Sequence, residues 1–400
     1  MMIIVMIFFV LLLVLGIYLS KKNIFSPSVI TPGIWLLCLS LFLLLSHTLP
    51  PLTSQFLIAI SLWVFLLSFT SLLMQSTRSV SKERKVSTFV RSTYFWISVL
   101  TYPLLLMFAY KAITTGTSGS WSLDLRLAAV GESIHFDKEY GGLYTIIWQV
   151  AYLIELMYYS KKTRHRVFIL GFILLSMGFF TMAKGMFLMF FVQTICVLYF
   201  KKVVSLKHLL YGLGGLFFLF VWLQSLRHSI DMSTAEDKED FLVLYLLSSM
   251  SAFDTLEPAS ALHFGENVLK VFYTMFYKMG WSSIEPVEAI LKFIKEPIMT
   301  NTYTTMYPYF VDFGYVGVGF FAVVMGVFFG YLFKRAQQGD EFYIVLYSFF
   351  VAFVVMQYVN EMMFTYLSGN IKNILLVYFP FFVAKYNFLR TKRSPKTLQT

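Results

Sequence analysis

The grouping of apolar residues is the feature that most constrains this chain. Long apolar runs recur from the N-terminus to the C-terminus, and most charged residues lie in the gaps between them. A helix that crosses a membrane needs roughly 20 consecutive apolar residues, which is about the length of most of these runs. The chain is 58% hydrophobic and 13% charged, whereas soluble domains average about 25% charged residues. We therefore predict an all-α, polytopic integral membrane protein.

The apolar runs predict about 11 transmembrane helices, which together form one transmembrane domain over residues 1–400. The predicted spans are residues 2–20, 30–48, 54–75, 94–113, 143–160, 167–182, 185–200, 208–226, 306–333, 342–359 and 370–388.

The gaps between the spans differ in charge. Lys and Arg gather in alternate gaps, as at 78–91 and 161–166, and in the C-terminal tail, whereas most Asp and Glu lie in the other gaps. Because cytoplasmic loops collect Lys and Arg, we predict an outside N-terminus and a cytoplasmic C-terminus. The net charge of +11 then reflects topology in a lipid bilayer, and we expect no nucleic-acid partner.

Two gaps on the predicted outer side are long, residues 114–142 and residues 227–305. Loops beyond about 12–15 residues usually carry function or are disordered. Apolar residues spaced along one helical face predict a helix that lies in the membrane interface. Ser282 and Glu285 suit a capping box that would begin a further helix. The residues of the predicted interfacial face are Val268, Val271, Phe272, Met275, Phe276 and Met279.

Three outer-side cations are candidates for binding phosphate or pyrophosphate: Arg126, Lys184 and Arg227. A guanidinium keeps its charge and bonds two phosphate oxygens at once. Each cation also has a structural alternative. Arg126 could pair with Asp124 or Glu132, and the other two could anchor span ends at the interface.

Candidate general bases are Asp254, Glu257 and His228. Residues three apart share a face of a helix, so Asp254 and Glu257 would lie together, or else they form a solvated turn. His228 could exchange a proton near neutral pH. The six histidines lack metal-ligand spacing, and the chain has no P-loop, dinucleotide fingerprint, HExxH or CxxC motif. We expect no metal and no cofactor.

Tyr303, Tyr307 and Asp312 open the ninth span and are candidate substrate-binding residues. Tyrosines also form the aromatic belt at a membrane interface, which is the alternative role for the pair. A carboxylate at the depth of Asp312 needs a partner. Glu155 lies near a cytoplasmic span end, where we expect a structural role.

The stretch from Asn301 to Gly317, NTYTTMYPYFVDFGYVG, resembles the start of a late helix in the Wzy-type polymerases of bacterial O-antigen and capsule repeat units. The turn Thr181-Met-Ala-Lys-Gly is similar to that family's small-residue turn, which often carries Arg where this chain has Lys184. The resemblance extends over nearly the whole chain, in its span number, its richness in Phe and its long outer loops.

The resemblance implies a glycosyltransferase of the bacterial inner membrane that uses neither metal nor nucleotide sugar. It would transfer a growing glycan from undecaprenyl pyrophosphate onto an incoming lipid-linked repeat unit, with a chain-length regulator and a flippase as candidate partners. Preorganised cations would stabilise the departing pyrophosphate. An O-antigen ligase-like transferase and an exporter or transporter of lipid-linked oligosaccharide are the alternatives.

Overall fold

A computed structural model describes residues 1–45, 49–77, 86–131, 133, 135–136, 140–204, 214–215, 247–288, 291 and 300–393. The regular secondary structure of these residues is helical, apart from an isolated β-bridge between Ser133 and Phe136. The predicted all-α class is therefore confirmed for the described part of the chain. The elements are α1 (Met2–Leu19), α2 (Pro27–Leu45), α3 (Ser54–Ser76), α4 (Thr88–Thr115), α5 (Trp121–Val130), α6 (Leu143–Met157), α7 (Arg164–Phe180), α8 (Lys184–Phe200), α11 (Ser248–Phe253), α12 (Lys270–Lys278), α13 (Tyr307–Gln337), α14 (Glu341–Val355), the 3-10 turn η2 (Met356–Tyr358) and α15 (Leu367–Arg393).

Seven helices among the described residues are long and apolar enough to cross a membrane: α1, α2, α3, α4, α13, α14 extended through η2, and the first part of α15. Helices α6 and α8 are apolar but shorter. On α1, Ile4, Leu11 and Val14 are exposed, a surface that water would disfavour and lipid accepts. Predicted span 208–226 lies almost wholly outside the described residues, so the total of about 11 stays a prediction.

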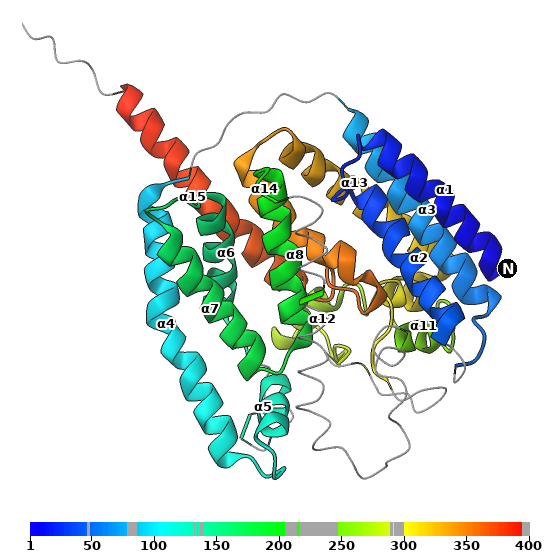
Figure 1. Ribbon diagram of the computed structural model, residues 1–400. Coiled ribbons are helices and arrows are strands. Elements are labelled where there is room, and N and C mark those ends of the chain that lie inside the picture. The colour runs from blue at the N-terminus through cyan, green and yellow to red at the C-terminus, as the bar shows by residue number, and fades with distance from the viewer. Residues whose placement is uncertain are drawn as a thin grey trace, which may run out of the picture. The chain divides into compact units, whose positions relative to one another are not determined.

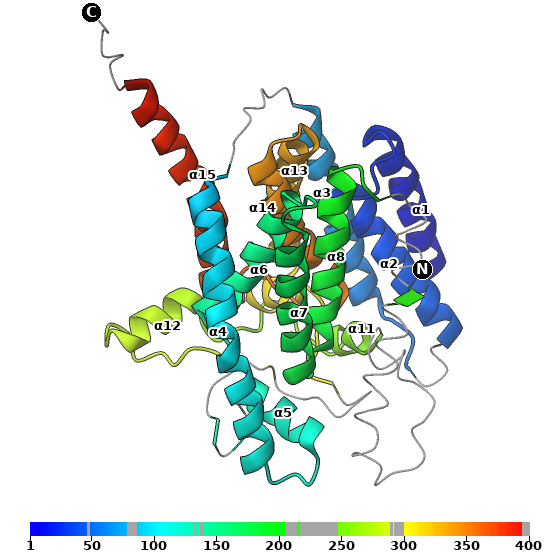
Figure 2. The same ribbon diagram turned by 60° about the vertical axis from the view of Figure 1, so that its left-hand side comes forward.

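The chain divides into two compact units. Unit 1 contains residues 1–80, 237–335 and 353–371, and unit 2 contains residues 81–236, 336–352 and 372–400. In unit 1, α1, α2 and α3 pack side by side (Figures 1 and 2). In unit 2, α4, α6, α7 and α8 form a second bundle, and α5 packs against α4.

Two glycines four residues apart let α13 approach α3 closely within unit 1. A Cβ added at Gly326 would lie 2.6 Å from the carbonyl oxygen of Leu67. A Cβ at Gly330 would lie 2.7 Å from the carbonyl oxygen of Ser71. Small residues at this spacing are typical of close helix contacts in membranes, where packing rather than the hydrophobic effect drives association.

We expect Gly330→Ala to lower the free energy of unfolding by about 1–3 kcal/mol, because the added methyl group meets a backbone carbonyl that cannot rotate away. The matched control is Gly33→Ala in α2, where the nearest atom to an added Cβ is the Leu13 side chain at 3.8 Å. Thermal unfolding in detergent, followed by tryptophan fluorescence, measures both. Equal melting temperatures for the two variants would contradict this account of the α3–α13 contact.

Candidate functional site

Helix α13 is broken near its start, at Gly314. This residue has φ 62° and ψ −149°, a combination that is essentially restricted to glycine. The break removes the usual amide donors to the carbonyls of Phe310 and Val311. The amide of Ala259 donates to the Phe310 carbonyl (3.0 Å), and the amide of Ala261 donates to the Val311 carbonyl (3.1 Å). The predicted span 306–333 corresponds to α13, and at its break the loop amides replace the missing helical bonds.

Asp312 ties the same loop to α13. Its carboxylate is buried and accepts hydrogen bonds from the Asn267 side-chain amide (2.7 Å), the Asn267 backbone amide (3.3 Å) and the Val268 backbone amide (2.9 Å). The predicted need for a partner is thus met by amides. Asp312 thereby fixes the residues that lead into α12.

A groove in unit 1 opens beside this junction. Tyr307 of α13 and Lys270 of α12 line it, together with Asn267 and with Asn360 and Thr365 from the segment between η2 and α15. The Lys270 ammonium donates to the Glu288 carbonyl (2.8 Å). The groove therefore combines an aromatic side chain, two side-chain amides, a hydroxyl and an ammonium group. Its remaining lining residues are Val287, Glu288, Leu291 and Pro308.

The two candidate tyrosines lie together at the groove. The ring centroids of Tyr303 and Tyr307 are 4.8 Å apart, with the planes tilted by 36°. Tyr303 is buried, and burial raises the pKa of its phenol. The three candidate substrate-binding residues therefore lie in one local group. Tyr307 lines the groove, and Tyr303 packs against the Tyr307 ring. Asp312 holds Asn267 in the groove wall.

Glu361 holds the opposite wall in place. Its carboxylate is 1% exposed and accepts hydrogen bonds from the amides of Met363 (2.6 Å), Phe364 (2.9 Å) and Thr365 (2.7 Å). The Tyr309 hydroxyl donates to the same carboxylate at 3.0 Å. This nest of donors fixes the backbone that presents Asn360 and Thr365 to the groove.

Two predicted pyrophosphate-binding cations lie in unit 2. Arg126 is half-buried on α5, and Lys184 is buried at the first position of α8. Trp121 at the start of α5 contacts Phe179 at the end of α7, with ring centroids 6.0 Å apart. Since α8 follows α7 after a short turn, both cations lie at one end of unit 2 (Figure 1). The Asp124 carboxylate accepts the Ser118 amide at 3.0 Å.

The third cation, Arg227, and the candidate base His228 lie outside the described residues. The other two candidate bases are in unit 1 but do not share a helical face, because α11 ends at Phe253. The Asp254 carboxylate accepts hydrogen bonds from the Thr53 amide (2.6 Å) and the Thr53 hydroxyl, at the N-cap of α3. Glu257 is exposed in the loop that follows. Of the two alternatives predicted for Asp254 and Glu257, the structure therefore shows the turn, and Asp254 faces α3.

The loop predicted to carry an interfacial helix contains α12, which has no buried residue. Phe272, Met275 and Phe276 are exposed, as a membrane-facing side requires. The predicted capping box at Ser282 is wrong over the described residues 282–288, which are not helical. The Ser282 hydroxyl accepts the Ile284 amide (3.1 Å), two residues on, and so forms a local turn instead of capping a helix.

Sequence patterns identified the tyrosines of the groove but missed Asn267, Lys270, Asn360 and Thr365. Lys270 carried one usable signal, because it lies off the apolar face predicted for its helix. The other three come together through the Asp312 and Glu361 hydrogen bonds, which join segments far apart in the chain. Over the part of the chain that the structure describes, no three His, Cys, Asp or Glu residues gather as a metal site.

Comparison of the chain with models of known protein families, with curated proteins and with solved structures finds no match.

Proposed function

We propose that the protein is a membrane glycosyltransferase that polymerises lipid-linked oligosaccharide repeat units, with undecaprenyl pyrophosphate as the lipid carrier. The observation that carries this proposal is the groove of unit 1. Tyr307 offers an aromatic face for a sugar ring, while Asn267, Asn360 and Thr365 offer both donors and acceptors for hydroxyl groups. The groove is small, so it would contact one part of a glycan, whose hydroxyl groups its polar side chains can orient. It lies in a chain whose helices suit a bilayer, the location of a lipid-linked donor.

The proposed reaction breaks the bond between the anomeric carbon of the donor glycan and the pyrophosphate oxygen. A hydroxyl oxygen of the incoming unit forms the new bond to that carbon and gives up its proton to a base. The lipid pyrophosphate leaves with the bonding electrons. Arg126, Lys184 and Arg227 are the proposed groups that stabilise its negative charge, and Asp254, Glu257 and His228 are the candidate bases.

The proposal also includes a location, the bacterial inner membrane, with the N-terminus outside and the C-terminus cytoplasmic. Gene deletion tests the function. Cells without the protein should still display single repeat units and lack long chains on a gel of extracted glycans. Loss of the single units as well would favour an exporter. Long chains that accumulate on the lipid carrier would favour a ligase-like transferase.

Within that assay, we expect Tyr307→Ala to remove most long chains, because the groove loses its aromatic face while the fold remains. Arg126→Ala should have the same effect through loss of charge at the leaving group. The matched control is Tyr277→Ala, since Tyr277 is exposed on α12 and does not line the groove. Normal ladders from Tyr307→Ala, with protein levels equal to the control, would remove the groove from the proposed function.

A further inference from the structure

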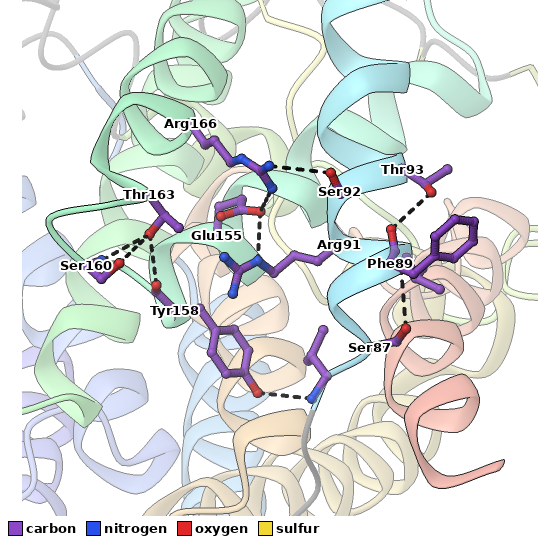
Figure 3. Close-up of polar contacts among 12 residues, drawn as sticks. Ser87, Phe89, Arg91, Ser92, Thr93, Glu155, Tyr158, Ser160, Thr163 and Arg166 are labelled. Atoms are coloured by element: carbon purple, nitrogen blue, oxygen red, sulfur yellow. Dashed lines mark hydrogen bonds and ion pairs between the residues drawn. The ribbon is translucent and has the colours of Figure 1, made fainter. Parts of the chain in front are cut away.

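Two arginines of unit 2 share a single carboxylate, where α4, α6 and α7 meet (Figure 3). The Nε of Arg91 lies 2.9 Å from Oε1 of Glu155, and Nη1 of Arg166 lies 3.4 Å from the same oxygen. Glu155 is fully buried, and the arginine side chains are 15% and 24% exposed. The two guanidinium groups are therefore brought together by one anion at the edge of the helix bundle.

Further contacts fix both guanidinium planes. Arg166 lies over the Phe95 ring (5.0 Å to the centroid), and its Nη2 donates to the Ser92 hydroxyl (3.4 Å). Arg91 lies over the Tyr158 ring at 5.2 Å. Rings and hydroxyls hold the arginines in place but add no negative charge.

Positive charge exceeds negative charge at this cluster. The Tyr158 hydroxyl donates to Glu341, and the Lys201 ammonium donates to the Met157 carbonyl (2.6 Å). Of the charged side chains named at this cluster, Arg91, Arg166 and Lys201 are cations, and Glu155 and Glu341 are carboxylates. A partly buried excess of positive charge calls for an anion.

The helix surface next to the arginines is apolar. Along α7, Phe168 and Phe172 are exposed two and six residues after Arg166, and on α4, Phe89 and Trp96 are exposed two residues before and five residues after Arg91. Helices α4 and α7 stay in contact along this stretch, since Tyr102 packs against Phe172 with ring centroids 6.0 Å apart. A cationic pair therefore lies at the end of an exposed apolar surface.

We infer that this cluster, Arg91 with Arg166, binds the phosphate headgroup of an anionic phospholipid whose acyl chains cover the exposed α4–α7 surface. Basic pockets between transmembrane helices suit such headgroups, and paired guanidinium forks suit phosphate oxygens. The inference is independent of the proposed function, because it rests on unit 2 side chains that take no part in the groove.

The test is native mass spectrometry of the detergent-purified full chain with phosphatidylglycerol or with phosphatidylcholine of the same acyl chains. Wild-type protein should bind phosphatidylglycerol more tightly. Arg166→Gln should weaken that binding on the order of tenfold, because it removes charge-assisted bonds to phosphate. The matched control Arg164→Gln, an exposed arginine of the same helix turn, should change binding by less than about twofold, since an exposed charge is screened.

Equal binding of the two lipids, or equal losses in Arg166→Gln and Arg164→Gln, would overturn the inference. Glycerol phosphate, which has no acyl chains, should compete only weakly with phosphatidylglycerol for the cluster. Competition as strong as that of the lipid would show a site for phosphate alone and would overturn the assignment to a lipid. If Arg166→Gln does not fold, Arg166→Lys provides the test of phosphatidylglycerol binding. It keeps the charge without the planar fork, so phosphatidylglycerol binding should fall several-fold, and unchanged binding would overturn the inference.

Discussion

Glu361→Ala is expected to lower the free energy of unfolding by about 3 kcal/mol or more, because it leaves several buried or half-buried donors without an acceptor. Those donors are the amides of Met363, Phe364 and Thr365 and the Tyr309 hydroxyl. Each orphaned donor costs about 1–3 kcal/mol when water cannot reach it, and the half-exposed ones cost less. The melting temperature in detergent, followed by tryptophan fluorescence, measures the loss.

The matched control for this prediction is Glu257→Ala, which removes the same side chain from an exposed position of the same unit. Its effect should stay within about 0.5 kcal/mol. Glu361→Gln should fall between the two variants, because its carbonyl oxygen still accepts while its amide group faces donors. If Glu361→Ala and Glu257→Ala unfold at the same temperature, the hydrogen bonds to the Glu361 carboxylate do not stabilise unit 1.

The long apolar helices among the described residues could be predicted from sequence because each depends on its own apolar run. Predicted span 54–75 corresponds to α3 (Ser54–Ser76), and predicted span 185–200 corresponds to α8 (Lys184–Phe200). Lipid requires that backbone bonds be satisfied within each helix, so local composition decides both the existence and the approximate limits of a span.

The groove could be predicted only in part, because its walls are fixed by contacts over long sequence separations. Glu361 lies just after the predicted span 342–359, where sequence gives no sign that it is buried, yet its carboxylate is buried and accepts bonds from backbone amides of its own loop. Gly314 lies in the stretch Asn301 to Gly317, whose sequence does not indicate a helix break. The break depends on the amides of Ala259 and Ala261, which bond to α13 from a distant loop. Periodicity reports which face of a helix is apolar and carries no information on which loop replaces a missing backbone bond.

Asp254 shows that a short spacing alone leaves two alternatives open, a shared helical face or a turn. Two acids three residues apart share a face only while the helix continues, and α11 ends before both of them. The Thr53 amide and hydroxyl then offer Asp254 a partner about two hundred residues earlier in the chain. A catalytic role for Asp254 must therefore allow for its bonds to the start of α3.

Asp312→Ala should release the loop that leads into α12 and so remove both the groove and long glycan chains. The carboxylate accepts two bonds from Asn267 and one from Val268, and it lies two residues before the break at Gly314. Without it, three donors lose their acceptor, and we expect a loss of about 3 kcal/mol. Because Asn267 lines the groove, glycan polymerisation should fall with it.

Limited proteolysis separates this loop release from general unfolding. Phe264 is 78% exposed and lies three residues before Asn267, which bonds to Asp312. Local opening exposes the backbone to protease. Chymotrypsin should therefore cut at Phe264 at least several-fold faster in Asp312→Ala than in wild type, at temperatures well below the melting transition. Asp312→Asn keeps one acceptor oxygen and should give an intermediate rate. A cleavage rate at Phe264 that equals the wild-type rate in both variants would mean that the loop is held by the Ala259 and Ala261 bonds alone, and Asp312 would then have to act on the substrate directly.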